Sequence, residues 1–178
     1  MFSRLFAITL LVVVCFSAQP AAADSFTKQF IPTHPPRPVP MLNFEDSHGR
    51  TFSLQDFRGR YILLNLWASW CGPCVHEMPA LDALRNKFTY RQFEVVALNE
   101  DHDGSSAAGA FYKRHGLQHM PIFIDTSSRV PSLLHVAGLP TTLFIDPRGM
   151  EIGRIEGEAD WSSPEAVSFV TKWMQKLR

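Results

Sequence analysis

Hydrophobic and polar positions alternate along the chain in blocks that predict strands and helices in turn. Tyr61–Trp67 and residues 93–98 are mostly apolar runs of strand length, interrupted only by Asn65 and Glu94, and are typical of strands that are buried on both faces. Between them, residues 71–88 carry apolar side chains at helical spacing. This order of strand, helix and strand indicates an α/β unit at the centre of the fold.

Turn-rich stretches separate further elements on both sides of this unit. In chain order we expect a hairpin of residues 41–44 and 50–52, a helical turn at 54–57, a helix at 105–115, a short strand at 122–124, a short helix at 130–136, a hairpin of strands 142–145 and 150–155, and a closing helix at 163–177. The order predicts an α/β sandwich with a mixed central sheet flanked by helices and an added N-terminal β-hairpin.

The first 23 residues have the pattern of an export signal that is removed from the fold. Arg4 supplies a positive start, residues 5–16 an apolar core, and the alanines at 21–23 a small-residue cleavage site. The apolar run is short for a membrane span. We expect a cleaved signal peptide at 1–23; an uncleaved anchor and a lipidated Cys15 are the alternatives.

Residues 24–38 lead from this signal into the domain and are rich in proline. The stretch 31–40 reads I-P-T-H-P-P-R-P-V-P, which offers few amide donors and is typical of a polyproline-type spacer. We therefore expect a tail and linker at 24–38 and one folded domain at 39–178. A chain of 178 residues suits one domain with an addition at one end.

Composition and charge narrow the class of partner. Hydrophobic residues make up 46% of the chain and aromatic residues 12%, which is ample for a core. The formal net charge is zero, so no basic face is indicated and nucleic acid is not expected as a partner. Nothing in the sequence indicates an obligate dimer, and we expect a monomer.

The chemistry concentrates in L-W-A-S-W-C-G-P-C, which ends at Cys74. A bridge enclosing only Gly72 and Pro73 would remove little loop entropy, so a structural staple is a poor interpretation. Cys71 is expected at a helix start, where exposed amides and the helix dipole stabilise a thiolate, which makes it the nucleophile. Cys74 lies one turn deeper, should be more buried, and is within reach to resolve a mixed disulfide.

Two stretches resemble a known family. W-C-G-P-C after an apolar strand is similar to the thioredoxin active site, and residues 44–74 as a whole resemble the exported TlpA/ResA-like thiol-disulfide oxidoreductases. So does G-L-P-T-T-L-F-I-D-P-R-G at residues 138–149. The resemblance covers residues 39–178 and implies a thioredoxin fold.

The resemblance also implies a surface that binds substrate. Pro140 matches a proline that is cis and faces the cysteines, and Leu139 would present its backbone to an extended substrate segment. Trp70 would form a contact surface beside the nucleophile, together with Gly72 and Pro73. The alternative for Pro140 is an ordinary trans turn proline.

Glu77 is the third catalytic residue that the resemblance implies. Thioredoxins proper carry a buried Asp six residues before the first cysteine, whereas Asn65 stands there in this chain and cannot take up a proton. Glu77 completes C-x-x-C-x-x-E and could move a proton for Cys74. The alternative is an acid that the helix dipole alone favours in the first turn.

By this resemblance the protein is a reductant of protein disulfides, with substrates such as apocytochrome c cysteines or metal-centre thiols. The dithiol is itself the redox centre, so neither a cofactor nor a metal is expected. We expect a location in the periplasm or at the extracytoplasmic face of the membrane. An oxidising compartment would leave the pair oxidised, which implies a membrane electron donor of the DsbD/CcdA type.

Other functions stay open at this point. An oxidase or isomerase is possible, although Gly-Pro between the cysteines favours the reducing end. A copper-delivery module would use the thiols as ligands. A zinc site with His115 and His119 would follow Cys74 at a longer interval than zinc fingers use. A peroxidase would need a lone cysteine after P-x-x-x-T-x-x-C, which the paired motif replaces.

Overall fold

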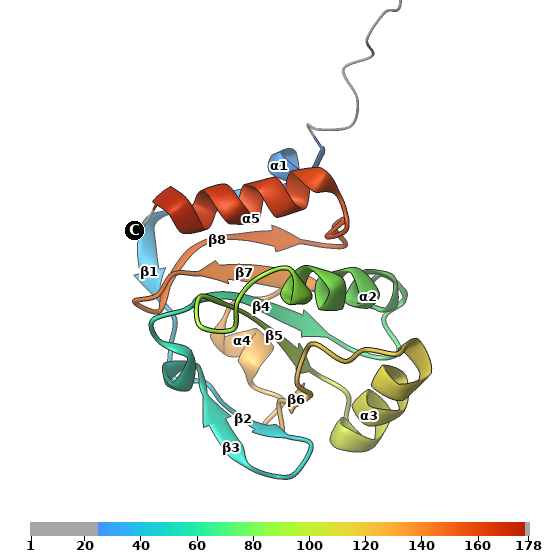
Figure 1. The fold of residues 1–178 in the computed structure, drawn as a ribbon. Coiled ribbons are helices and arrows are strands. Elements are labelled where there is room, and N and C mark those ends of the chain that lie inside the picture. The colour runs from blue at the N-terminus through green and yellow to red at the C-terminus, as the bar shows by residue number, and fades with distance from the viewer. Residues whose placement is uncertain (1–24, 177–178) are drawn as a thin grey trace, which may run out of the picture.

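The structure, a computed structural model, describes residues 25–176. They form one mixed sheet in the order β1-β8-β7-β4-β5-β6-β2-β3, with helices on both faces (Figure 1). The strands are β1 (Ile31–Pro38), β2 (Asn43–Asp46), β3 (Thr51–Ser53), β4 (Tyr61–Trp67), β5 (Phe93–Asn99), β6 (Phe123–Ile124), β7 (Thr141–Ile145) and β8 (Met150–Glu156). The helices are α1 (Ser25–Gln29), the 3₁₀ helix η1 (Leu54–Phe57), α2 (Gly72–Asn86), α3 (Gly104–His115), α4 (Val130–Leu133) and α5 (Pro164–Lys176).

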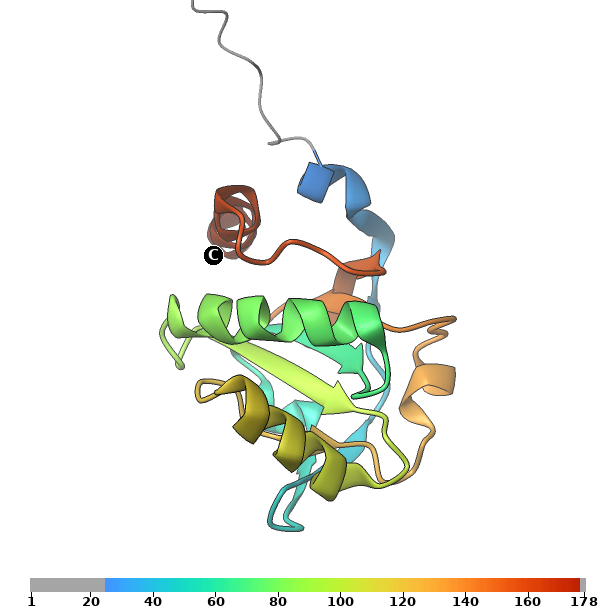
Figure 2. The same ribbon diagram turned by 90° about the vertical axis from the view of Figure 1, so that its right-hand side faces the viewer.

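The sheet divides the core into two layers. β4 pairs parallel with β5 and antiparallel with β7, and every residue of β4 and β5 is buried. Successive side chains of a strand point to opposite faces. Leu63 and Trp67 therefore join the layer under α2, α3 and α5, while Leu64 and Leu66 join the layer on the side of α4 and η1. Figure 2 shows α2 and α3 on one side of the sheet and α4 on the other.

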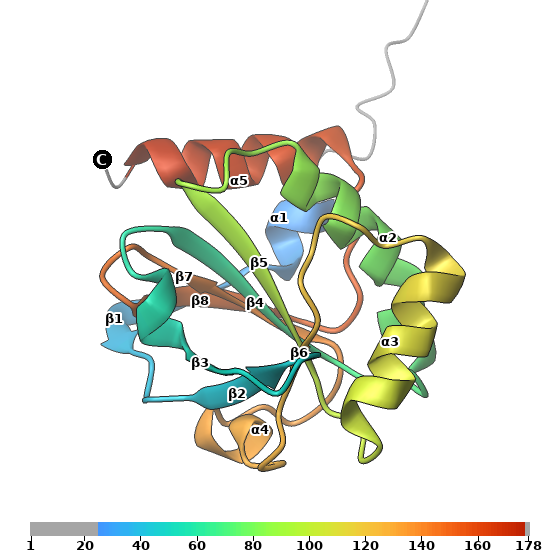
Figure 3. The same ribbon diagram turned by 60° about the horizontal axis from the view of Figure 1, so that its bottom comes forward.

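The N-terminal segment differs from the expected tail and linker. β1 pairs antiparallel with β8 as the edge strand of the sheet, with an irregular register between Pro32 and Arg37 (Figure 3). Proline is tolerated there because an edge strand needs hydrogen-bond partners along one side only. Residues 25–38 are thus part of the folded domain. The expected signal peptide lies outside the described residues.

Aromatic packing fixes this segment. The Phe30 ring lies 5.1 Å from the ring of Phe144 and 4.9 Å from that of Phe169 in α5. Gly153 of β8 makes room for it, since a Cβ at that position would lie 2.2 Å from the Phe30 ring. The glycine is therefore required by the close approach of Phe30, not by its backbone conformation.

The expected thioredoxin fold is confirmed, with small shifts at element ends. The largest shift is in α4, which was expected to reach residue 136 but ends at Leu133. Its end follows from the backbone, because Leu134 leaves the helical conformation and His135 has a φ of 53°. The chain then runs to β7 through an irregular loop.

That loop and the start of α2 lie at one end of the sheet. Thr141, the first residue of β7, pairs with Leu66, the second-last residue of β4. β4 ends one residue later, and a short turn leads from it to Cys71. Leu139 and Pro140, which directly precede β7, and the two cysteines therefore lie at the same end of the sheet, where β4 ends.

Candidate active site

Cys71 and Cys74 form a disulfide at the start of α2, with their Cα atoms 5.2 Å apart. Cys71 is the N-cap of the helix, and its Sγ accepts a hydrogen bond from the Cys74 amide at 3.3 Å. Cys71 keeps 6% of its surface exposed, whereas Cys74 has none. Of the two residues, only Cys71 therefore keeps any surface that a partner molecule could reach. In the dithiol state the helix dipole would stabilise a Cys71 thiolate.

The surroundings of Cys71 are open and partly apolar. Trp70 is 71% exposed, in contrast to Trp67, which is fully buried. Gly72 and Pro73 are exposed on the other side of Cys71. A large exposed aromatic side chain next to a nucleophile is suited to contact with a protein partner.

The peptide bond between Leu139 and Pro140 is cis, as the resemblance implied. Leu139 packs against the same hydrophobic cluster that contains Cys71 and Cys74. The Pro140 carbonyl accepts a hydrogen bond from Gly157 N at 2.8 Å, but within residues 25–176 the backbone N–H and C=O of Leu139 have no hydrogen-bond partner. They are thus available to pair with an extended peptide.

Glu77 is buried beneath the cysteines, with 2% of its surface exposed. One carboxylate oxygen, Oε1, accepts a hydrogen bond from Asn65 Nδ2 at 2.7 Å. The other, Oε2, accepts from Ala159 N at 3.1 Å and from Trp161 Nε1 at 3.0 Å. Burial raises the pKa of Glu77 to about 7, although these three hydrogen bonds act to lower it. A carboxyl with this pKa can both accept and release a proton near neutral pH.

Asn65 and Trp161 belong to this site, and sequence reasoning assigned neither of them a part in it. Asn65 Nδ2 also donates to Thr142 Oγ1 at 2.9 Å, so it joins Glu77 to β7. Trp161 lies 84 residues after Glu77 in the chain. No local sequence pattern predicts a contact between residues so far apart in the chain. The sequence pointed only to Asn65, because that residue stands at the position where thioredoxins carry an Asp.

Asp101 is a third residue to which sequence reasoning gave no part in the site, because the polar loop 99–104 is typical of a solvated loop. The side chain is instead buried, and its carboxylate accepts the Ser69 amide at 3.0 and 3.2 Å and Asn99 Nδ2 at 2.8 Å. Ser69 lies two residues before Cys71. Asp101 therefore fixes the turn that leads to Cys71. The signal for it was the N-x-D spacing directly after a strand, which permits an Asx turn.

Replacing Asp101 with Ala should destabilise the oxidised protein by about 2 kcal/mol, because the half-buried Ser69 amide and the buried Asn99 Nδ2 lose a charged acceptor. Urea unfolding at neutral pH measures this change. Asp103→Ala is the matched control, since Asp103 is an exposed acid of the same loop whose side chain caps nothing. It should change stability by less than about 0.5 kcal/mol. Equal effects of the two variants would contradict the role given to Asp101.

The described part of the chain also bears on the metal-binding and membrane-anchored alternatives. Residues 25–176 contain no group of three or more His, Cys, Asp or Glu side chains that could hold a metal ion. His115, a candidate zinc ligand, stacks on Phe111 with ring centroids 4.2 Å apart. None of the helices in this part of the chain is both long enough and apolar enough to span a bilayer.

Comparisons with known proteins agree with the fold and identify the family. The family model described as AhpC/TSA family matches residues 35–150. The thiol-disulfide oxidoreductase ResA of Bacillus thuringiensis subsp. konkukian is 34% identical over 120 residues, which are 67% of this chain and 68% of that protein. A ResA of Bacillus cereus is 29% identical over 154 residues, 86% of this chain and 88% of that protein. A solved structure, a putative thiol:disulfide interchange protein DsbE from Chlorobium tepidum, has a TM-score of 0.67 at 26% identity, covering 79% of this chain and 95% of that one.

Proposed function

This chain belongs to the AhpC/TSA family as a ResA-like thiol-disulfide oxidoreductase, and we propose that it works as an exported reductant of disulfides in protein substrates. One observation carries the proposal. Cys71 keeps a small exposed surface at the N-terminus of α2, Cys74 is enclosed, and the backbone of Leu139, which has no hydrogen-bond partner within residues 25–176, lies at the same end of the sheet. This arrangement provides a nucleophile, a resolving thiol and a place for the substrate chain.

In the proposed reaction the dithiol form acts first through Cys71. Its thiolate attacks one sulfur of a substrate disulfide, the substrate S–S bond breaks, and the other substrate sulfur leaves as a thiolate that takes a proton. Cys74 then gives its proton to the Glu77 carboxylate and attacks the Cys71 sulfur. The second substrate thiolate leaves and takes up a proton. Two electrons have passed to the substrate, and the protein holds the Cys71–Cys74 disulfide.

Glu77 is suited to this proton transfer by its place on the helix. It lies three residues after Cys74, so both project from the same side of α2. Its network contains donors to the carboxylate from Asn65, Ala159 and Trp161. These donors stabilise the ionised form that accepts the proton, while burial favours the protonated form that returns it.

The finer assignments rest on the family resemblance and the N-terminal pattern. We propose a periplasmic or extracytoplasmic location, cleavage of residues 1–23, and a mature chain that starts at Asp24, directly before α1. Substrates would be proteins such as apocytochrome c or proteins with metal-centre thiols. A membrane donor of the DsbD/CcdA type would reduce the pair after each turnover. We propose that the domain acts as a monomer.

The reduction potential of the Cys71–Cys74 pair tests the direction of electron flow. We expect a value at or below about −270 mV, the thioredoxin range, when the mature domain is equilibrated with dithiothreitol buffers. A value near about −120 mV would contradict the reductant and indicate an oxidase. Failure to equilibrate, together with stoichiometric retention of copper or zinc, would indicate a metal-delivery module instead.

A further inference from the structure

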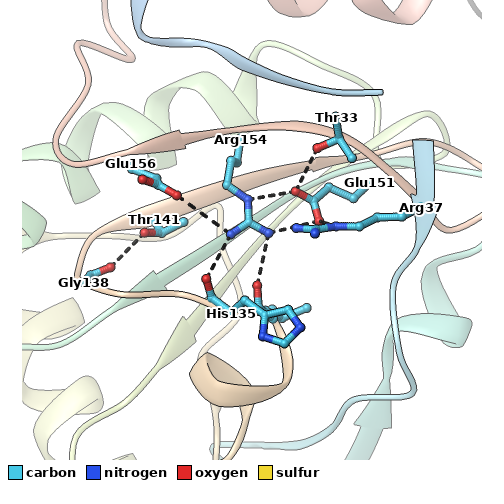
Figure 4. A network of polar contacts seen from close by, with 9 residues as sticks. Thr33, Arg37, His135, Gly138, Thr141, Glu151, Arg154 and Glu156 are labelled. Atoms are coloured by element: carbon cyan, nitrogen blue, oxygen red, sulfur yellow. Dashed lines mark hydrogen bonds and ion pairs between the residues drawn. The ribbon is translucent and has the colours of Figure 1, made fainter. Parts of the chain in front are cut away.

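Arg154 of β8 has its guanidinium buried beneath the chain that joins α4 to β7, with 7% of the side chain exposed. Nη2 donates to the Leu134 carbonyl at 3.1 Å, and Nη1 donates to the His135 carbonyl at 3.4 Å (Figure 4). Both carbonyls follow the last residue of α4, where the helix no longer provides N–H partners. Arg154 thus supplies hydrogen-bond donors to two carbonyls at the C-terminal end of α4.

The loop that Arg154 holds has little support of its own. α4 has only four residues, and His135 keeps a φ of 53°, which is unfavourable for a residue with a Cβ. At its far end the Gly138 carbonyl accepts a hydrogen bond from Thr141 Oγ1 at 2.8 Å. The loop that contains Leu139 and Pro140 is therefore held at two places. One is the pair of hydrogen bonds from Arg154 to the Leu134 and His135 carbonyls, and the other is the hydrogen bond from Thr141 to Gly138.

A β-bulge brings Arg154 and its main partner to one face of the sheet. Residues three apart on a regular strand point to opposite faces. In β8, however, Gly153 pairs with Phe144 and Glu151 with Ile145, so one residue of β8 is skipped. Glu151 and Arg154 consequently lie side by side, with Arg154 Nε to Glu151 Oε1 at 2.8 Å and Nη2 to Oε2 at 3.1 Å.

The edge strand β1 completes the pairing. Glu151 Oε2 also accepts from Arg37 Nε at 2.9 Å, and Oε1 accepts from Thr33 Oγ1 at 3.2 Å. Burial alone would raise the pKa of Glu151, but the two arginines hold it below its ordinary value, so the carboxylate stays charged. Glu156 Oε1 lies 4.0 Å from Arg154 Nη1 at the other end of the network. A buried guanidinium needs such a partner set to remain in place.

We propose that Arg154 is a positioning residue for the substrate-presenting loop, and that Glu151, Arg37 and the Pro-rich strand β1 hold it there. The inference rests on the proposed function, because it takes Leu139 and Pro140 as the place where substrate pairs. Arg154 touches no reacting sulfur. Its loss should therefore weaken capture of an extended protein substrate and leave the chemistry of the cysteines unchanged.

The test compares Arg154→Met with Arg148→Met. Arg148 forms an ion pair with Asp146 in the turn before β8, is 71% exposed, and lies outside the network. The probes are insulin, a protein disulfide that must pair with the loop, and a small aromatic disulfide, which needs no backbone pairing. For Arg154→Met we expect KM for insulin to rise roughly tenfold or more. The rate on the small disulfide, and the redox equilibrium constant of the Cys71–Cys74 pair with dithiothreitol, should stay within about twofold of the wild type. Arg148→Met should behave as the wild type.

Arg37→Ala keeps the inference testable if Arg154→Met fails to fold. The Arg37 side chain is 48% exposed, so its removal leaves no cavity, and we expect a smaller rise in KM for insulin, roughly two- to fourfold. Unchanged KM values in the folded variants would overturn the inference. So would a parallel loss on the small disulfide, because the damage would then reach the cysteines.

If the protein oxidises its substrates instead of reducing them, the wild type itself would show it, independently of the Arg154→Met variant. A wild-type protein that oxidises substrates would show an oxidant reduction potential and no insulin reduction. The same comparison of KM would then use a reduced, unfolded protein as substrate. An unchanged KM in Arg154→Met would overturn the role of the loop in that case, and a raised KM would support it.

Discussion

Cys74→Ser protein should accumulate as a covalent mixed disulfide with its protein substrates, whereas Cys71→Ser protein should form none. The reason is the asymmetry of burial. Cys71 retains an exposed edge from which to attack, and Cys74, fully enclosed, can meet only the sulfur of Cys71. Without Cys74 the first step proceeds and the second cannot. Nonreducing gels of the mature chain, which would hold no third cysteine, measure the adduct.

Turnover in Cys74→Ser should fall by at least about 10³-fold. The Cys74 thiol is held next to the mixed disulfide, and intramolecular groups so placed act at effective concentrations far above the millimolar thiol that must replace it. Serine is close in size, so the fold should persist, which the thermal melting of both variants checks. Adducts of equal yield from both variants would contradict the assigned roles. If neither variant forms a mixed disulfide and both lose bound copper, the protein would instead be a metal-delivery module.

Strong periodic segments could be predicted from the sequence, and the edge of the sheet could not. The apolar run of β4 and the helical spacing of α2 leave one interpretation each. The prediction for β1 was wrong because its prolines remove amide donors, and a segment with few donors is typical of a spacer. Such a segment can still pair as an edge strand, but only if its partner strand is known. That partner, with Gly153 shaped to receive Phe30, lies more than a hundred residues away.

The site shows the same division between local and distant information. Cys71, Cys74 and the turn between them are adjacent in the sequence, and their chemistry follows from a helix start. The environment of Glu77 is instead made by Asn65 on β4 and Trp161 after β8. The sequence identified Glu77 as a candidate through a family motif. It could not say that the carboxyl is buried, which is what raises its pKa.

Glu77→Gln should remove a pH dependence from the stability of the oxidised protein. The pKa of Glu77 is about 7 in the folded state and should be near its ordinary value of 4.5 in the unfolded chain. Between these values the folded protein holds a proton that the unfolded chain has released, so stability falls as pH rises through this window. The loss should be at most about 3 kcal/mol. Glutamine stays neutral, so Glu77→Gln should match the wild type near pH 5 and exceed its free energy of unfolding by up to that amount at pH 8.

Urea unfolding of both proteins from pH 5 to pH 8 measures this difference. Burial also raises the pKa of Glu100, to about 8, but that residue titrates in both proteins and cancels in the comparison. Glu158→Gln is the matched control, because Glu158 is an exposed acid near the same network and should leave the pH dependence nearly unchanged. A wild type whose stability rises from pH 5 to pH 8 in parallel with Glu77→Gln would show that Glu77 is ionised throughout.

The same substitution separates a proton carrier from a structural acid. The glutamine side chain of the Glu77→Gln variant can still accept from Trp161 and Ala159, and Asn65 can turn its amide to accept from it, so the hydrogen-bond network and the fold should survive. It cannot take the Cys74 proton. Resolution of the mixed disulfide should therefore slow by about 10²-fold or more, although the protein is more stable at pH 8. A stabilised Glu77→Gln variant that resolves at the wild-type rate would assign Glu77 to the structure alone, since a group that moves the proton cannot be lost from the network without loss of rate.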